Sequence, residues 1–136
     1  MKIITLFDSI HGKSKKIASL LPNSHYVCNL PNLLKYEYFI FVCPTYGDEE
    51  ITYNMETFLL NLKIKKRKYT ICELGNYFGD TYEFGAKKII VQFLKKLKWE
   101  EFYPCLSLDS MPAIDLDTFK IWERKLNAIL RKHNCK

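Results

Sequence analysis

The sequence contains no apolar run long enough to cross a membrane. One of its longest, Tyr38–Cys43, falls far short of the roughly 20 residues that a membrane-spanning helix needs. The opening segment, Met1–Asp8, reaches an acidic residue too early to hold a secretory h-region and its small-residue cleavage site. We therefore expect a cytoplasmic protein with no membrane partner.

The five cysteines form no C-x-x-C pair and no Cys/His cluster at metal-ligand spacing. This spacing argues against a structural zinc site, and the odd count argues against a disulfide scaffold. Four of the cysteines lie in or beside apolar, strand-like runs, where a free thiol usually behaves as a small buried hydrophobe. We therefore assign no metal site and expect these four thiols to be buried.

The composition is that of one ordinary globular domain. The chain has 136 residues, of which 48% are hydrophobic and 26% charged, with no visible repeat or linker. This length leaves little room for a second hydrophobic core. We expect a single domain over residues 1–136, and a monomer.

The charge is moderately basic, at +6. Much of it lies in Lys63–Lys68 and in a second group of lysines at positions 87, 88, 95, 96 and 98. Such runs bind phosphates or an acidic partner, but they also occur as solvated helix ends, and the sequence leaves both readings open. No nucleic-acid-binding motif accompanies the charge, so no nucleic-acid partner is expected.

Strand-like and helix-like patterns alternate along the chain. Apolar, β-rich runs predict five strands, at Lys2–Phe7, Ser24–Leu30, Tyr38–Cys43, Tyr69–Leu74 and Phe102–Leu108. Helical spacing predicts helices at Lys13–Leu21, Tyr53–Leu62, Glu83–Leu97 and Leu116–Leu130. This order is typical of an α/β fold, a doubly wound five-stranded parallel sheet with helices on both faces. Only seven residues separate the second and third strands, so the second crossover helix must be shortened.

In doubly wound parallel sheets, ligands bind beyond the carboxyl ends of the strands, in the loops that follow them. The loop after the first strand, Ser9–Ser14, is rich in hydroxyls, has one glycine and leads into a helix, so it is suited to a terminal phosphate. It is neither a Walker loop nor G-x-G-x-x-G. The alternative is plain helix capping by Ser9 and a glycine turn.

The next two loops carry aromatic residues beside glycines. Tyr46 and Gly47 follow the third strand, and Tyr77 and Phe78 follow the fourth, among three glycines. Exposed aromatics are unfavourable in water unless something covers them, so these loops favour a planar ligand. The alternative for the first of them is a simple strand-to-helix turn.

Together the three loops resemble those of the flavodoxin family. Ser9–Ser14 matches the flavodoxin phosphate loop T/S-x-T-G-x-T, with His11 in place of the central hydroxyl. Pro44–Asp48 and Phe78–Tyr82 match the two flavin loops, and the closing helix around Trp122 is also similar. The resemblance extends over nearly the whole chain.

This resemblance implies an FMN cofactor. The phosphate would lie on Ser9–Ser14 and the ring between Tyr46 and Tyr82. Under this hypothesis the cofactor-binding residues are Ser9, Ile10, His11, Gly12, Lys13, Ser14, Pro44, Thr45, Tyr46, Gly47, Gly75, Asn76, Tyr77, Phe78, Gly79, Asp80 and Tyr82. The implied function is transfer of single electrons to a redox partner, and no catalytic residue is assigned. The basic charge favours a partner with an acidic docking face.

Two alternatives remain. Three features are similar to the flavodoxin-like activator of class Ib ribonucleotide reductase: Phe7-Asp8-Ser9, the short span from Gly12 to Thr45, and Gly75-Asn76 followed by Phe78-Gly79. That protein supplies the oxidant for assembly of a manganese–tyrosyl cofactor. The other alternative is a flavin-free shell that binds a partner through its lysine face, against which the aromatic loops argue.

Overall fold

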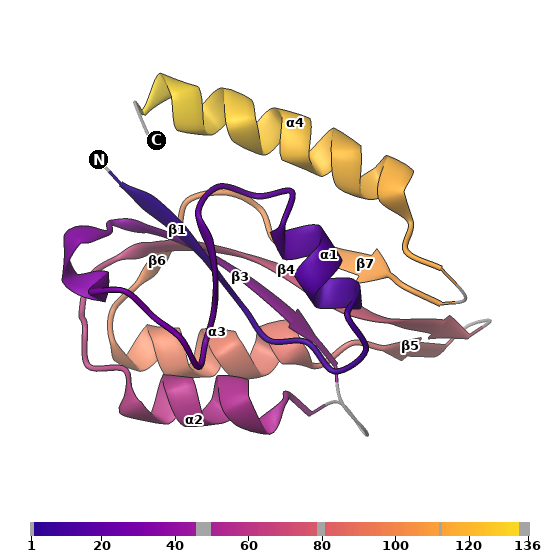
Figure 1. Ribbon diagram of the computed structural model, residues 1–136, viewed down its shortest axis with the longest axis horizontal. Coiled ribbons are helices and arrows are strands. Elements are labelled where there is room, and N and C mark those ends of the chain that lie inside the picture. The colour runs from indigo at the N-terminus through magenta and orange to yellow at the C-terminus, as the bar shows by residue number, and fades with distance from the viewer. Residues whose placement is uncertain (1, 46–49, 79–80, 112, 134–136) are drawn as a thin grey trace.

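The computed structural model describes residues 2–45, 50–78, 81–111 and 113–133, with the backbone alone at 76–78 and 81–83. It has three layers, a twisted sheet between two layers of helices (Figure 1). The sheet contains β2 (Ser24–Tyr26), β1 (Ile3–Phe7), β3 (Tyr38–Pro44) and β4 (Lys68–Phe78), paired in parallel in that order. Two short strands, β6 (Glu100–Glu101) and β7 (Leu106–Asp109), pair in parallel with the far side of β4. The predicted doubly wound parallel sheet is confirmed.

The fifth strand is split, whereas the sequence predicted one strand over Phe102–Leu108. Pro104 interrupts it because proline has no N–H to donate to the ladder. The Pro104 carbonyl accepts hydrogen bonds from the Trp122 indole N–H, at 2.8 Å, and from the Thr70 hydroxyl, at 3.4 Å. The chain therefore leaves the sheet between β6 and β7 and is held there by side chains.

A hairpin replaces part of the predicted loop after the fourth strand. β4 continues to Phe78, four residues beyond the prediction, and pairs antiparallel with β5 (Thr81–Glu83). Glu83 lies opposite Asn76 in this ladder. Because its backbone is extended, Glu83 cannot begin the next helix as predicted, and that helix starts at Ala86.

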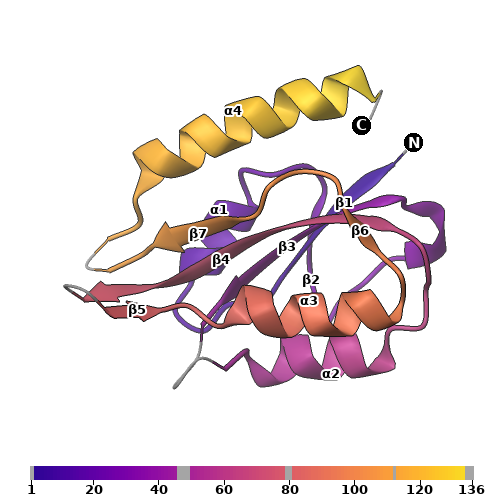
Figure 2. The ribbon, with the colours of Figure 1, turned by 180° about the vertical axis from the view of Figure 1, so that it is seen from behind.

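The helices cover both faces of the sheet. α1 (Lys13–Ala18) and α4 (Leu116–Lys132) lie on one face, and α2 (Tyr53–Asn61) and α3 (Ala86–Lys96) on the other (Figures 1 and 2). Along β3, Phe39 and Phe41 belong to the core under α2 and α3, while Ile40 and Val42 belong to the core under α1 and α4. Burial on both faces explains why this strand is continuously apolar.

The connection from β2 to β3 carries no α-helix. It contains a single three-residue 3-10 turn, η1 (Leu33–Lys35), which begins where the Asn32 side chain accepts the Leu34 N–H at 3.1 Å. The predicted shortening of the second crossover is confirmed. The preceding elements also end early, α1 at Ala18 and β2 at Tyr26.

The expectation for the cysteines is only partly correct. Cys43 and Cys72 are buried and Cys105 is half-buried, but Cys28 is exposed because β2 has already ended and the chain turns away from the sheet. All four are free thiols. In the described part of the chain, no helix combines the length and the hydropathy that crossing a bilayer requires.

The buried stripe of α4 supports a first prediction. Phe119 is fully buried against Trp122, whereas Ile121 on the same helix is 53% exposed. Phe119→Ala should lower the free energy of unfolding by about 3–5 kcal/mol, because it removes a large core side chain and leaves a cavity. Ile121→Ala should change it by less than about 0.5 kcal/mol. Urea denaturation followed by circular dichroism measures both, and equal losses would contradict the assigned orientation of α4.

Candidate functional site

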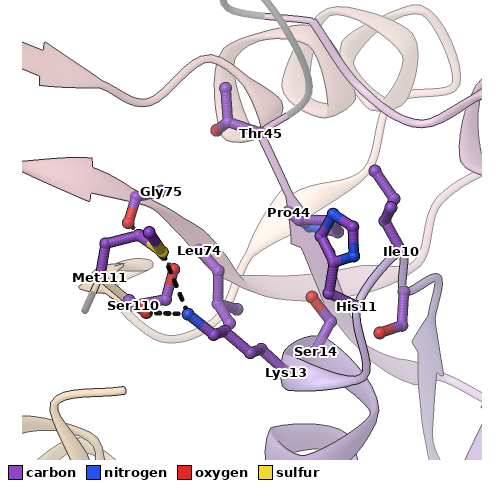
Figure 3. Close-up of a pocket in the computed structure, with 11 residues that line it drawn as sticks. Ile10, His11, Lys13, Ser14, Pro44, Thr45, Leu74, Gly75, Ser110 and Met111 are labelled. Carbon is purple, nitrogen blue, oxygen red and sulfur yellow. Dashed lines mark hydrogen bonds between the residues drawn. The ribbon is translucent and has the colours of Figure 1, made fainter. Parts of the chain in front are cut away.

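The carboxyl ends of four parallel strands surround one cavity of about 420 Å³ (Figure 3). It lies beside the point where the strand order reverses, between β1 and β3, which is the usual ligand position in open α/β sheets. Its volume is within the range of small-molecule sites. Its lining residues are Ser9, Ile10, His11, Lys13, Ser14, Pro44, Thr45, Leu74, Gly75, Ser110 and Met111.

The loop after β1 forms a tight turn that closes on its own side chains. The Ser9 N–H donates to Asp8 Oδ1, and the Gly12 N–H donates to Ser9 Oγ, both at 2.9 Å. Gly12 has φ = +85°, in the left-handed region that favours glycine, and it is the N-cap of α1. Ser9 therefore closes the turn and does not cap the helix. Of the simpler alternative for this loop, the glycine turn is confirmed and the capping by Ser9 is wrong.

Ser14 is the most unusual residue of the cavity. It is 1% exposed, and its hydroxyl oxygen is buried with no hydrogen-bond partner among the residues that the structure describes. A buried hydroxyl without a partner costs roughly 1–3 kcal/mol. Because Ser14 lines the cavity, a ligand that accepts a hydrogen bond there would remove this cost.

Lys13 gives the cavity a positive charge. Its ammonium group donates to the Ser110 carbonyl and lies 3.2 Å from Met111 Sδ, so it connects the start of α1 to the loop after β7 (Figure 3). No acidic side chain is among the described residues that line the cavity. The amides of the first turn of α1 also lack intrahelical acceptors, as in any helix. These groups together suit an anion.

The wall formed by β3 and β4 is fixed by polar contacts to the start of α3. Thr45 Oγ1 accepts the Gly85 N–H at 3.0 Å. The buried Glu73 carboxylate accepts the Lys87 N–H at 3.1 Å through Oε1 and the Ser107 hydroxyl at 2.5 Å through Oε2. A carboxylate at a helix N-terminus is electrostatically favourable. These contacts hold α3, and with it the β4–β5 hairpin, against the strand ends.

Ser110 and Met111, in the loop after β7, were missed by the sequence analysis. The Ser110 N–H and hydroxyl both donate to the Gly75 carbonyl, at 3.0 and 3.1 Å. This double contact fixes the end of β4 against the loop. The sequence could have indicated both residues, because ligands bind at the loops that follow parallel strands and these two lie in the loop after the predicted fifth strand.

The structure brings eight of the predicted residues together around the cavity. These are Ser9, Ile10, His11, Lys13, Ser14, Pro44, Thr45 and Gly75. Gly12 shapes the turn without lining the cavity. The backbones of Asn76, Tyr77, Phe78 and Tyr82 form the β4–β5 hairpin, but their side chains lie outside the described residues. Tyr46, Gly47, Gly79 and Asp80 also lie outside them.

Cys43, just before Pro44, is unsuited to nucleophilic chemistry. Burial raises the pKa of its thiol to about 12, so it remains protonated at neutral pH. Within residues 2–45, 50–78, 81–111 and 113–133, no group of three or more potential ligands from His, Cys, Asp and Glu could hold a metal ion. The chemistry of the described cavity is therefore binding of an anion beside an apolar wall.

The lysine runs lie at different distances from the cavity. The run Lys63–Lys68 ends at the first residue of β4, at the amino edge of the sheet. Gly75 lies seven positions after Lys68 along the strand, which is about 23 Å. Lys87 lies near the cavity, because its N–H donates to Glu73, which is two residues before Gly75 on β4. The basic charge is thus divided between the two edges of the sheet.

The partnerless Ser14 hydroxyl yields a second prediction. In the ligand-free protein, Ser14→Ala should raise the free energy of unfolding by about 1 kcal/mol, because it removes a buried polar group without a partner. Ser19→Ala is the matched control, since the Ser19 hydroxyl, at the end of the same helix, donates to the Lys16 carbonyl at 2.6 Å. That variant should lose about 0.5–1.5 kcal/mol. A loss of stability in Ser14→Ala, measured by urea denaturation, would show that its hydroxyl is satisfied.

The fold is shared with solved flavodoxin structures. No protein-family model matches the chain, and no curated protein matches it significantly. A cysteine-to-serine mutant of flavodoxin from Pseudomonas aeruginosa matches with a TM-score of 0.76 and 22% identity, over 96% of this chain and 99% of that one. Flavodoxin 2 from Bacillus cereus gives 0.66 and 21%, over 80% and 84%. Flavodoxin from Fusobacterium nucleatum bound to flavin mononucleotide gives 0.62 and 17%, over 74% and 68%. The chain therefore has a flavodoxin-like fold.

Proposed function

We propose that this chain binds FMN in the cavity and passes single electrons to a redox partner. The buried, partnerless hydroxyl of Ser14 carries the proposal, because it lies where the resemblance places the phosphate. The flavodoxin-like fold supports it, and the flavodoxin of that fold from Fusobacterium nucleatum is bound to flavin mononucleotide. When bound, the flavin would supply the capacity to take up and release electrons one at a time.

The residues around the turn suit a phosphate group. Ser14 has a free hydroxyl, and Ser9 Oγ already accepts the Gly12 N–H, which leaves its own proton available to donate. Lys13 lines the same wall and supplies positive charge. Hydroxyl and amide donors with one nearby cation are the groups that bind phosphate in many nucleotide sites.

The other end of the cavity suits the flavin ring. Pro44 and Thr45, at the end of β3, lie beside Leu74 and Gly75 of β4, and the Thr45 N–H donates to the Leu74 carbonyl at 2.7 Å. These residues therefore form one continuous wall of the cavity, against which a flat group would lie. The Gly85–Thr45 and Ser110–Gly75 hydrogen bonds fix this wall in place. We retain Tyr46 and Tyr82 as the proposed residues that cover the ring.

The docking face for the redox partner should lie at the carboxyl edge of the sheet, because electron transfer requires the partner to approach the flavin. Lys63–Lys68 is about 23 Å away along β4 and is too distant to take part directly. Lys87 and Lys88, at the start of α3, lie on the near side. We propose that a partner with an acidic face docks there, on a monomer of this chain.

The ribonucleotide reductase activator is a second candidate function. The short β2–β3 connection, with its single 3-10 turn, is the feature that favours it, because the resemblance to the activator included this short span. The two functions are distinguished by adding the FMN-loaded, reduced protein to a manganese-loaded reductase subunit in the presence of oxygen. Formation of the tyrosyl radical would support the activator, and its absence would support electron carriage.

The third prediction tests FMN binding. Purified protein should bind FMN with quenching of the flavin fluorescence, and Ser14→Ala should weaken binding roughly 10- to 150-fold, the loss of a hydrogen bond of about 1.5–3 kcal/mol to a charged group. Riboflavin, which lacks the phosphate, should bind equally to both proteins. Ser19→Ala should bind FMN like the wild type, because Ser19 lies outside the cavity.

Two outcomes would contradict the assignment. If only FAD binds, or if no flavin binds, the cavity has another ligand. If Ser14→Ala weakens FMN and riboflavin to the same extent, Ser14 does not contact the phosphate.

The fourth prediction tests the docking face. Lys87→Glu/Lys88→Glu should slow electron transfer to the physiological partner, with a smaller effect at high salt, because reversed charges lower the encounter rate. Lys65→Glu/Lys66→Glu, with the same change in net charge at the far edge, should slow it much less. Stopped-flow kinetics at two ionic strengths would compare them, and an equal effect of both pairs would indicate long-range steering without a local docking face.

A further inference from the structure

A second hollow, of about 580 Å³, lies on the other side of the molecule from α4, between α2 and the β2–β3 connection. We call it the α2 groove. Its walls are mainly apolar, and its lining residues are Val27, Cys28, Leu30, Leu33, Asn54, Thr57, Phe58, Asn61, Leu62, Lys63 and Ile64. None of these residues lines the cavity at the carboxyl edge.

The α2 groove exists because the β2–β3 connection is short. In a doubly wound sheet the crossover between parallel strands normally contains a helix that covers the face of the sheet. Here residues 27–37 form only a turn and η1. Leu30 and Leu33 are left half-buried beside Phe58, and Leu34 is 67% exposed. Within the described ranges, this face of the sheet is covered by α2 and α3 alone. The apolar side chains of the connection are left partly uncovered where a third helix would pack.

Both ends of the α2 groove are held by hydrogen bonds. At one end, the Asn54 side-chain amide donates to the Tyr26 hydroxyl at 2.8 Å. At the other, the Arg67 guanidinium donates to the carbonyls of Tyr36, at 2.8 Å, and Leu34, at 3.3 Å. These contacts tie the connection to α2 on one side and to the start of β4 on the other. The groove is therefore preformed, which lowers the conformational cost of binding.

Positive charge is concentrated at the amino-edge end of the α2 groove. Lys63 is one of its lining residues, and Lys65 and Lys66 follow it in the chain. Across residues 27–37 and 53–68 there are six basic side chains (Lys35, Lys63, Lys65, Lys66, Arg67 and Lys68) and two acidic ones (Glu37 and Glu56). Of the six, Lys68 forms an ion pair with Glu100 at 2.7 Å, so the other five carry the positive charge that is open to an occupant. An occupant with apolar anchors and acidic flanks would be complementary to both features.

We propose that the α2 groove binds an amphipathic, acidic helix from a partner protein, which takes the position of the missing crossover helix. Helix-in-groove recognition uses apolar anchors at i, i+3 or i+4, and i+7. α2 has nine residues and is about 14 Å long, so it matches a helix of two to three turns. A concave apolar wall gives no advantage to a nucleic acid, whose contacts are mainly to phosphates, and a flat bilayer cannot enter it.

This surface is independent of the proposed FMN site. It would account for the Lys63–Lys68 run, which lies too far from the cavity to serve electron transfer directly. A partner held in the α2 groove would leave the cavity at the carboxyl edge open. The two sites can therefore be tested separately.

The fifth prediction uses selection from a phage-displayed library of random 16-residue peptides on the folded wild-type protein. Selected peptides should carry apolar residues at helical spacing with Asp or Glu between them. Their affinity should fall at least 10-fold for Thr57→Arg, because Thr57 is an exposed groove residue and the longer side chain fills the space. It should fall similarly for Lys63→Glu/Lys65→Glu, and the wild-type affinity should decrease as salt increases.

Matched controls lie on α4, on the other face of the sheet. Ile121→Arg introduces the same side chain at an exposed position, and Lys120→Glu/Lys125→Glu makes the same change in charge. Both controls should bind the selected peptides like the wild type. Circular dichroism and FMN binding should be unchanged in all four variants, which would separate loss of the groove from loss of the fold.

Three results of the selection would overturn the proposal. They are failure to select any peptide, selection of peptides without acidic residues, and binding of the selected peptides to Thr57→Arg as tightly as to the wild type. Sedimentation of the wild type as a dimer that Thr57→Arg dissociates would assign the α2 groove to a second copy of the chain. Binding of a single-stranded oligonucleotide or of anionic vesicles that Thr57→Arg abolishes would assign it to nucleic acid or membrane.

Discussion

The burial of β3 on both faces is the constraint on which the rest of the structure depends. Its backbone pairs in parallel with β1 and β4, and its side chains alternate between two separate cores. Parallel pairing brings the carboxyl ends of all these strands to one edge of the sheet. The loops that follow them therefore meet in one cavity, although they are far apart in the sequence.

Polar contacts fix the edge around that cavity. Glu73 and Thr45 hold the start of α3, Ser110 holds the end of β4, and Lys13 connects α1 to the loop after β7. Against this background, the partnerless hydroxyl of Ser14 is notable. Buried polar groups in folded proteins usually have partners, and this exception is the observation on which the proposed phosphate site rests.

The short β2–β3 connection changes the molecule in a second place. It removes a helix from one face, leaves the α2 groove, and places basic side chains beside apolar ones. No residue that lines the groove also lines the cavity at the carboxyl edge. One sheet thus presents two different surfaces, a cavity suited to an anion and a groove suited to an acidic helix.

The sequence by itself determined the order of the elements, the doubly wound sheet and eight of the residues around the cavity. These follow from local periodicity and from strand-end loops, because the burial of a strand or helix is written into its own residues. Only the tertiary structure decided the split at Pro104, the β4–β5 hairpin, the contact of Lys13 with Ser110, 97 positions apart, and the α2 groove. Local sequence patterns do not predict long-range contacts between side chains, because those contacts depend on the packing of the whole sheet.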